Sequence, residues 1–285
     1  PVPGIKIVKD AGALALMDGD NGMGQVVSKR GMEECLDRAG KHNVGVVIMQ
    51  RSNHFGAAGI FAALALDRGM VGLVTTNTVR VIAPFGGKEK QIGNNPVSIA
   101  VPGAPPIVLD MALSTVARGY VLQALKAGKP IPEGWGVDSE GEPTTDPDEV
   151  IQTGSLTAVG GYKGVGLSVA IDAILGSVTG GAHSHNVVGI MNPEEPGNVT
   201  HVFAALRIEA LLPLAEFSAA VNALGAFLRA SPKAAGVERI WMPGEIEHES
   251  EKERIEGGIP LLPERYAELA ELAEKIGIPE LETRS

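Results

Sequence analysis

The chain has 285 residues, of which 44% are hydrophobic and 20% are charged, a composition ordinary for a globular protein of one or two domains. Its 24 basic and 34 acidic residues give a net charge of −10 at pH 7, which argues against nucleic acid or an anionic membrane as a partner. A single cysteine, Cys35, excludes an internal disulfide framework and fits a cytoplasmic protein. The sequence shows neither a signal peptide nor an apolar stretch of about 18 residues. Neither secretion nor a membrane span is therefore expected.

The first part of the chain predicts alternating helices and strands. Val26–Ala39 has apolar residues near one face of a helix, and the β-branched run Val44–Met49 is typical of a buried strand. Ala57–Leu66 is small and apolar, which fits a helix packed closely on a sheet, and Val71–Thr75 predicts another strand. This order resembles a βαβ unit. No GxGxxG motif follows a strand, so an ordinary Rossmann site is not supported.

The remainder predicts strands and turns over residues 80–110, and then helices separated by loops rich in glycine and proline. The expected helices are Thr115–Lys126 with Ser114 as its cap, Val165–Leu175, Leu214–Arg229 and charged segments within 245–285; the expected loops are 131–147 and 176–200, and His201–Ile208 is an expected strand.

His54 is the most informative candidate for chemistry. It belongs to the run Arg51-Ser-Asn-His-Phe-Gly56, which directly follows the strand expected at 44–49. A buried strand that ends in polar residues and glycine delivers those residues to a cleft. Histidine exchanges a proton near neutral pH, so His54 is a candidate acid or base. A core or loop histidine with one backbone hydrogen bond is the alternative interpretation.

Three further motifs have both a structural and a functional interpretation. Gly93-Asn-Asn-Pro96 is either a plain turn or a loop whose amides contact a polar substrate. Asp110-Met-Ala-Leu-Ser114 ends a strand and opens a helix. The backbone N–H groups there make an ordinary cap or bind a cofactor phosphate. Gly161-Tyr-Lys-Gly164 places Lys163 in a glycine-rich turn, where it is either a solvated lysine or a phosphate ligand.

Taken in order, these and neighbouring motifs resemble those of the malate/L-lactate dehydrogenase-like oxidoreductases: SNHFGAAG, TNT, APFGG, GNNP, LDMALS, IPEGWGVD, GEPTTDP, GGYKGVGLS and MPGE. This non-Rossmann family includes ureidoglycolate, sulfolactate and diketogulonate dehydrogenases and cyclic imino-acid reductases. The resemblance extends from about residue 5 to residue 260. It implies an α/β (α+β) fold with a mainly antiparallel central sheet in the cofactor domain, a helical second domain and a homodimeric assembly.

The resemblance also divides the chain. Residues 1–75 are expected to form part of the substrate and dimerisation domain, 76–210 the NAD(P)-binding domain, and 211–285 a C-terminal helical part that returns to the first domain. The family's N-terminal helical segment, with its Ser-His-Gly motif and a nearby arginine, has no counterpart before Pro1. In several members it supplies a catalytic histidine and the arginine for the substrate carboxylate. Arg51 or Arg118 is the expected substitute for that arginine.

The function that the resemblance implies is hydride transfer between NAD or NADP and a small 2-hydroxy or 2-oxo acid of the malate, lactate or sulfolactate type. His54 is the expected proton donor and acceptor, and Asn94 and Arg118 are the expected substrate contacts. The expected cofactor contacts are Thr78, Ala112, Leu113, Ser114, Lys163, Gly244 and Glu245. No metal is expected. Asn94 and Leu113 stand where most members have threonine, which leaves the substrate open.

Two other functions remain as alternatives. One is a truncated, catalytically weak or inactive homologue that still binds the nicotinamide cofactor. The other is a metal-dependent hydrolase built on His183, His185 and His201, because metal sites favour clustered histidines. No carboxylate stands at a recognisable ligand spacing from these histidines.

Overall fold

The computed structural model of the chain describes residues 2–190, 192, 194–279 and 283. It contains two compact units, Pro1–Ile240 and Trp241–Ser285. Positions 191 and 193 of the expected loop 176–200 lie outside the described residues, as do positions 280–282, 284 and 285 of the charged tail.

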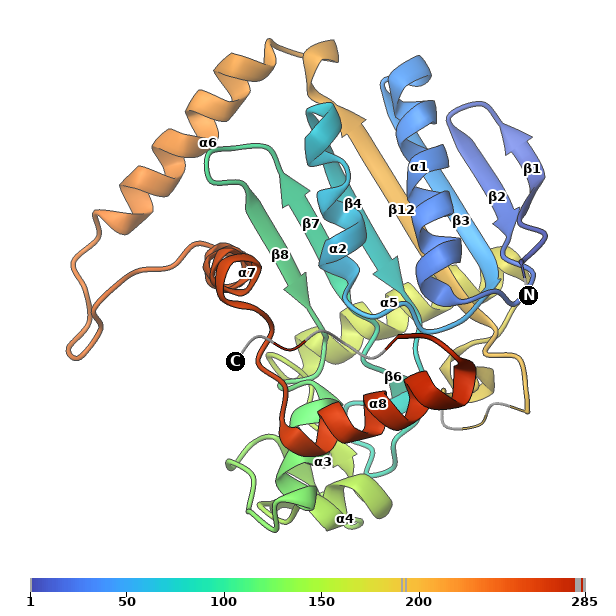
Figure 1. Ribbon diagram of the computed structural model, residues 1–285, viewed down its shortest axis with the longest axis vertical. Coiled ribbons are helices and arrows are strands. Elements are labelled where there is room, and N and C mark those ends of the chain that lie inside the picture. Colours follow the sequence, from blue (N-terminus) through green and yellow to red (C-terminus); the bar gives the residue numbers. More distant parts are fainter. Residues whose placement is uncertain (1, 191, 193, 280–282, 284–285) are drawn as a thin grey trace. The chain divides into compact units, whose positions relative to one another are not determined.

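The first unit is built on two sheets (Figure 1). The larger sheet has the spatial order β1 (Lys6–Ala11), β2 (Leu14–Asp18), β3 (Val44–Ser52), β12 (Val199–Arg207), β4 (Met70–Thr76), β7 (Val97–Val101) and β8 (Ile107–Met111). The smaller sheet has the order β10 (Pro143–Thr144), β9 (Gly136–Val137), β11 (Ser155–Leu156), β5 (Arg80–Ile82) and β6 (Ile92–Gly93). In the larger sheet only β2 and β3 pair in parallel. The mainly antiparallel central sheet expected from the sequence is therefore confirmed.

The expected βαβ unit is present in a modified form. Strands β3 and β4 run in the same direction, but β12 lies between them and is antiparallel to both. A strand from far along the chain thus separates the two strands of the unit. The expected segments 1–75 and 76–210 consequently share one sheet, and their assignment to a substrate and a cofactor domain stays a prediction.

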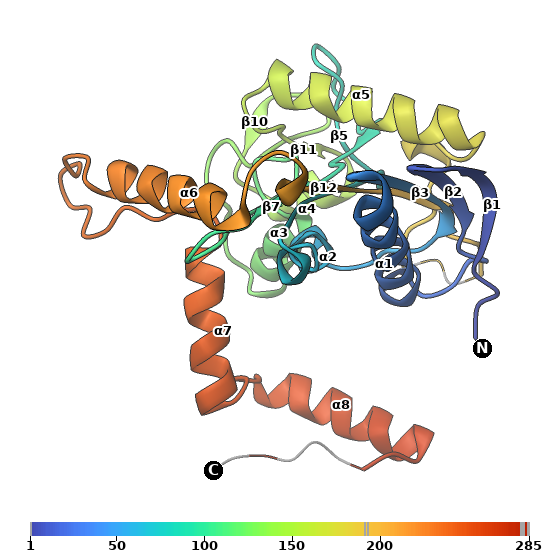
Figure 2. The same cartoon turned by 90° about the horizontal axis from the view of Figure 1, so that it is seen from above.

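Helices cover both faces of the larger sheet. The first unit contains α1 (Gly24–His42), α2 (Ala58–Ala63), α3 (Arg118–Lys126), α4 (Pro147–Gln152), α5 (Tyr162–Thr179) and α6 (Leu214–Arg229), with short 3₁₀ turns η1 (Leu66–Arg68), η2 (Ser184–Asn186) and η3 (Ile208–Ala210). Helices α1 and α2 pack on one face and α5 on the other (Figure 2). The second unit contains α7 (Glu245–Gly257) and α8 (Pro263–Ile276). Among the described helices, none combines the length and apolar character needed to cross a membrane.

Four helices begin at positions that differ from the sequence prediction, α1 and α2 by only one or two residues and α3 and α5 by three. Helix α3 begins at Arg118 instead of Thr115, with Ala117 as an N-cap that makes no side-chain hydrogen bond. The predicted Ser114 cap is wrong, because the Ser114 hydroxyl donates to the Val116 carbonyl at 2.7 Å. Helix α5 runs from Tyr162 to Thr179 and extends the predicted helix at both ends, since its terminal glycines and hydroxyl residues hide helical periodicity.

The main core lies between the larger sheet and helices α1 and α2. Val47 and Met49 of β3 and Phe203 of β12 are fully buried there. Close packing requires glycine at position 45 of β3, because a Cβ there would collide with the Cys35 carbonyl oxygen and the Ala39 nitrogen of α1. This contact fixes how closely α1 approaches the strand that ends before His54.

Replacing Gly45 with alanine should lower the free energy of unfolding by about 1–3 kcal/mol, because the new methyl group forces α1 away from β3. Gly40→Ala within α1 is the matched control, since its Cβ would meet no atom within 4 Å. It should instead raise the free energy of unfolding by about 0.5–1 kcal/mol. Urea denaturation measures both variants, and equal stabilities would contradict the close packing of α1 on β3.

Candidate functional site

Strand β3 ends in a short loop that carries His54. The Asn53 side-chain amide donates to the carbonyl oxygens of Asn21 and Gly22, both at 2.9 Å, which ties the loop to the turn before α1. His54 itself is exposed, and its Nδ1 accepts a hydrogen bond from the Gly56 N–H at 3.2 Å. The other ring nitrogen, Nε2, has no partner within the described chain. It is therefore the atom available to a ligand.

A second histidine, His201 of β12, is fully buried beside this loop. Its ring packs on Phe55 with a centroid distance of 4.5 Å. The distance from Nδ1 to Thr76 Oγ1 is 2.8 Å, and that from Nε2 to Ser52 Oγ is also 2.8 Å. Burial lowers the pKa of His201 to about 3, so the ring is neutral at pH 7. Because Ser52 ends β3 and Thr76 ends β4, His201 joins the ends of three adjacent strands.

The sequence motifs do not predict this role of His201. In the alternative of a metal-dependent hydrolase, His201 is instead a metal ligand together with His183 and His185. Both ring nitrogens of His201 face hydroxyl groups. His183 and His185 stack on each other with centroids 6.0 Å apart. In the described part of the chain, no group of three or more His, Cys, Asp or Glu side chains could hold a metal ion. The available signal was the β-branched strand around His201, which predicts a buried side chain.

The two candidate arginines differ in their surroundings. Arg51 forms ion pairs with Asp18 at 3.1 Å and Asp20 at 3.4 Å, so its guanidinium is already engaged and gives no support to its use as a carboxylate clamp. Arg118 is the exposed first residue of α3 and pairs with no carboxylate among the described residues. Arg118 is the better candidate of the two for a substrate carboxylate.

Thr78 and the two asparagines of the GNNP motif form a hydrogen-bonded cluster. The Thr78 hydroxyl donates to Asn94 Oδ1 at 2.9 Å, and the Thr78 N–H donates to Asn95 Oδ1 at 2.9 Å. The Asn95 amide donates to the Ser168 carbonyl of α5, also at 2.9 Å, and the Asn94 amide donates to Ser114 Oγ at 3.4 Å. This cluster connects the end of β4 to α5 and to the turn at 112–114.

The turn at 112–114 lies beside the start of α5. The Leu113 N–H donates to the Asn94 carbonyl at 2.7 Å, and the Leu113 carbonyl accepts from the Val159 N–H at 2.9 Å. Gly164 packs on the carbonyls of Leu113 and Val159 so closely that a Cβ would not fit. Ala112 is half-buried in the same turn. The structure thus brings the turn and the glycine-rich motif together, as a shared phosphate site requires.

The N-terminus of α5 has the features of an anion site. Gly160 and Gly161 both have a φ of 61°, and no side chain caps the helix. Lys163 is exposed, and its ammonium has no hydrogen bond or ion pair within the described residues. Uncapped N–H groups at the positive end of a helix dipole, together with a free cation, favour phosphate. These residues therefore fit the phosphates of a dinucleotide cofactor.

Gly244 and Glu245 belong to the second unit and begin α7. Glu245 is buried, and its carboxylate accepts from the Met242 N–H at 3.0 Å. This bond ties the chain just before α7 to the first residue of the helix. The expected cofactor contact of Gly244 and Glu245 stays a prediction.

His201 connects the strands that precede the His54 loop and the Thr78–Asn94 cluster. His54 lies two residues beyond Ser52, and Thr78 lies two residues beyond Thr76, while His201 contacts both hydroxyls. The His54 loop and the Thr78–Asn94 cluster therefore leave adjacent strand ends.

The chain is similar to known proteins over most of its length. The malate/L-lactate dehydrogenase family profile matches residues 1–270. The L-sulfolactate dehydrogenase of Methanocaldococcus jannaschii is 41% identical over 279 residues, covering 98% of this chain and 80% of that protein. The malate dehydrogenase of Pyrococcus abyssi is 38% identical over 288 residues, covering 98% of this chain and 79% of that protein. The solved structure of the M. jannaschii enzyme superposes with a TM-score of 0.88 at 40% identity, covering 97% of this chain and 79% of that one.

The buried neutral His201 predicts a pH dependence of stability. Its pKa is about 3 in the folded chain against an ordinary value of 6.5. Between these values the unfolded chain binds a proton that the folded chain does not, so stability falls as pH drops below about 6.5. The His201 contribution should amount to about 2 kcal/mol between pH 7 and pH 5.

Urea denaturation of the wild type and of His201→Gln at pH 7, 6 and 5 isolates this contribution. The wild type should lose more stability than the variant across this range, because glutamine does not titrate. Parallel pH profiles would contradict a neutral His201.

Proposed function

Because the chain belongs to the malate/L-lactate dehydrogenase family, we propose that it transfers hydride between a nicotinamide cofactor, NAD or NADP, and a small 2-hydroxy or 2-oxo acid. One observation carries this proposal. The exposed His54 follows the end of β3, and the end of the nearby strand β4 leads to the Thr78–Asn94 cluster and the N-terminus of α5.

The cofactor would be held mainly through its phosphates. The uncapped N-terminus of α5, the ammonium of Lys163 and the backbone of Ala112–Ser114 supply the donors and the positive charge. Thr78 adds a hydroxyl group close to the same turn, and Gly244 and Glu245 stay proposed as cofactor contacts on the motif resemblance alone. A bound nicotinamide supplies the hydride for the reduction of a carbonyl carbon.

His54 manages the proton of this reaction. When a 2-oxo acid is reduced, negative charge develops on its carbonyl oxygen, and an imidazole within hydrogen-bond reach stabilises that charge and donates a proton. Nε2 of His54 is proposed for this role because it has no partner among the described residues. A ring that donates from Nε2 keeps its other proton on Nδ1, so the 3.2 Å contact between Nδ1 and the Gly56 N–H has to open during turnover. The exposed ring exchanges its proton with solvent between turnovers. In the direction of oxidation, His54 accepts the hydroxyl proton.

Asn94 and Arg118 orient the acid. The side-chain oxygen Oδ1 of Asn94 accepts a hydrogen bond from the Thr78 hydroxyl. This bond fixes the direction of the Asn94 side-chain amide. Arg118 offers a planar set of donors that binds a carboxylate through two hydrogen bonds. The two relatives compared above are named for malate and for L-sulfolactate, and we propose an acid of this class as the substrate.

A homologue that binds the cofactor without turnover is the alternative. Its support is the paired state of Arg51 together with asparagine and leucine at positions 94 and 113, where most members of the family have threonine. Cofactor binding through α5 is common to both functions, so turnover distinguishes them.

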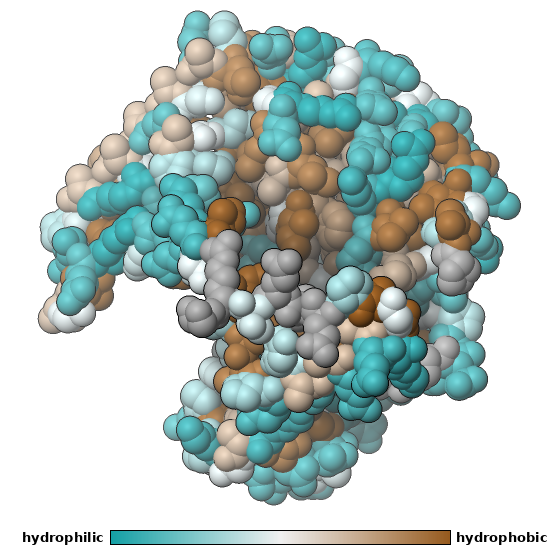
Figure 3. Space-filling view, viewed as in Figure 1, coloured by the Kyte–Doolittle hydropathy of each residue, from teal (hydrophilic) through white to brown (hydrophobic). Residues whose placement is uncertain are grey.

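We also propose a homodimer in the cytoplasm. The surface over α1 and α2 mixes hydrophobic with hydrophilic residues (Figure 3), and Met23 and Ile60 are 69% and 64% exposed there. Exposed apolar side chains of this size are the kind that a protein partner covers. The single cysteine, Cys35, is free and buried, as suits a reducing compartment.

His54→Ala should lower kcat about 10²–10⁴-fold, because proton transfer in the reaction loses its positioned donor. The dissociation constant of the reduced cofactor should change less than about twofold, since none of the proposed phosphate ligands is altered. Steady-state kinetics and fluorescence titration measure the two quantities. A large loss of cofactor affinity with unchanged kcat would show instead that His54 is structural.

Lys163→Ala should have the opposite effect. The dissociation constant of the cofactor should rise about tenfold, as expected when a charge-assisted contact with phosphate is lost, while kcat at saturating cofactor stays within a few-fold. Lys129→Ala, at an exposed position after α3, is the matched control for loss of one positive charge. If both variants bind the cofactor as the wild type does, Lys163 is not a cofactor ligand.

A further inference from the structure

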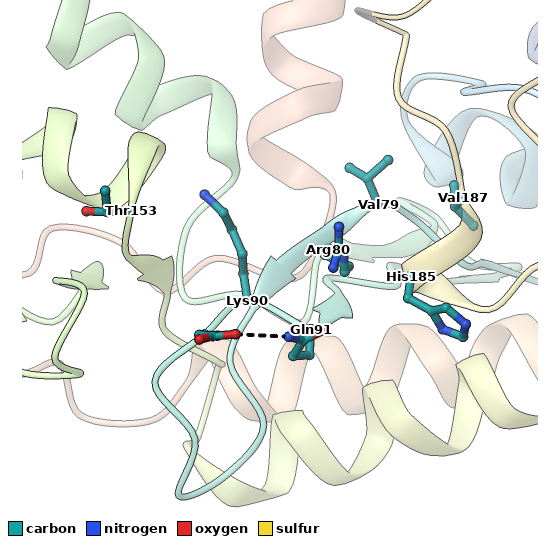
Figure 4. A pocket seen from close by; sticks show the side chains of 8 residues that line it. Val79, Arg80, Lys90, Gln91, Thr153, His185 and Val187 are labelled. Atoms are coloured by element: carbon teal, nitrogen blue, oxygen red, sulfur yellow. Dashed lines mark hydrogen bonds between the residues drawn. The ribbon is translucent and has the colours of Figure 1, made fainter. Parts of the chain in front are cut away.

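A polar pocket of about 380 Å³ lies beside the smaller sheet and takes no part in the proposed chemistry described above. Figure 4 shows side chains from β5, from the loop before β6, from the end of α4 and from the η2 region around it. Its lining consists of Val79, Arg80, Glu89, Lys90, Gln91, Thr153, His185 and Val187.

The charge of the pocket is positive in a chain whose net charge is −10. Arg80 and Lys90 outweigh Glu89, whose carboxylate accepts a hydrogen bond from the Gln91 amide at 3.3 Å. Neither Arg80 nor Lys90 pairs with a carboxylate among the described residues. Concentrated, unpaired positive charge in a concave site attracts anions.

Lys90 and Arg80 have different roles in this pocket. The Lys90 ammonium donates to the carbonyls of Ile151 at 2.9 Å and Gln152 at 3.3 Å, at the C-terminal end of α4. Partial burial and the nearby charges of Arg118 and Arg80 lower the pKa of Lys90. Lys90 is thus anchored to the fold. Arg80 is exposed, and its guanidinium has no hydrogen bond or ion pair in the described part of the chain, so this group is free to bind a ligand.

The pocket adjoins the proposed site. Arg80 pairs across the sheet with Gly93, the residue before Asn94, and lies two residues beyond Thr78. The hydroxyl of Ser184, the residue before His185 of the lining, accepts from the Gly93 N–H at 2.9 Å. A ligand that contacts Asn94 or Thr78 therefore lies close to Arg80.

We propose that this pocket binds a compact oxyanion group carried by one of the reactants, with Arg80 as the principal ligand. The group is a carboxylate, sulfonate or phosphate, all of which a guanidinium binds through two parallel hydrogen bonds. Its source is either the second acidic group of a dianionic 2-oxo acid or the additional phosphate of NADP. The identity of the reactant rests on the proposed function, whereas the binding of an oxyanion does not.

The first test uses inorganic phosphate as the probe and requires no activity. Isothermal titration of the wild type, Arg80→Gln and Arg30→Gln compares the loss of one pocket cation with the loss of one cation on α1, where Arg30 pairs with Glu34. Phosphate should bind the wild type and Arg30→Gln alike and bind Arg80→Gln at least about tenfold more weakly. No binding to the wild type, or equal affinity for all three proteins, would overturn the proposal.

The second test identifies the source of the oxyanion. If the substrate carries the oxyanion, Arg80→Gln should raise KM about tenfold for oxaloacetate and leave KM for pyruvate unchanged. If NADP carries it, Arg80→Gln should raise the dissociation constant of NADPH and leave that of NADH unchanged. Arg80→Lys should recover part of either effect. Equal changes for all four ligands, or none, would contradict the proposal. A wild type that oxidises no reduced cofactor would refute the proposed function and leave the phosphate test valid.

Discussion

The buried imidazole of His201 connects the hydroxyl groups of Ser52 and Thr76, and the arrangement of the candidate site depends on this connection. Burying a ring with two polar nitrogens costs free energy unless both nitrogens have partners. Here each nitrogen has one, and burial keeps the ring neutral by lowering its pKa to about 3. The ring therefore joins the ends of three strands without placing a charge in the core.

The candidate site follows from what lies just beyond these strand ends. Beyond Ser52, the chain is tied to the turn before α1 by Asn53 and exposes His54. Beyond Thr76, Thr78 begins the cluster that continues through Asn94 to the 112–114 turn and α5. Lys163 and Arg80, which lie near this cluster, have no carboxylate partner among the described residues. A polar site for two anionic reactants accounts for both features.

Local sequence patterns predict where helices and strands lie along the chain, but they do not predict which elements become neighbours in space. The helix expected at Leu214–Arg229 agrees with α6, and the strand expected at 44–49 forms the first part of β3. The insertion of β12 between β3 and β4 depends on pairing between distant segments, which no local periodicity encodes. The role of His201 is hidden for the same reason, because its two partners come from other strands. Gly45 likewise reveals its importance only through the backbone of α1.

The candidate site could be predicted in part. The motif order leads to His54, Asn94 and Lys163 as candidates, and the contacts among Asn94, Leu113 and Gly164 explain why those motifs occur together. Ser114 shows the limit of single-position reasoning: a serine before an expected helix suggests a cap, yet its hydroxyl bonds to Val116 and accepts from Asn94. Arg80 belongs to none of the motifs read from the sequence, and only its free guanidinium beside a pocket draws attention to it.

Titration of the purified chain with NADH and NADPH, followed by addition of oxaloacetate, sulfopyruvate or pyruvate, tests the central claim most directly. Fluorescence reports cofactor binding, and the absorbance of the reduced nicotinamide reports turnover. The proposed function predicts saturable binding of a reduced cofactor and its oxidation by at least one of the three acids. Failure to bind either cofactor would contradict a nicotinamide-dependent oxidoreductase, and binding without oxidation would contradict the catalytic role of His54.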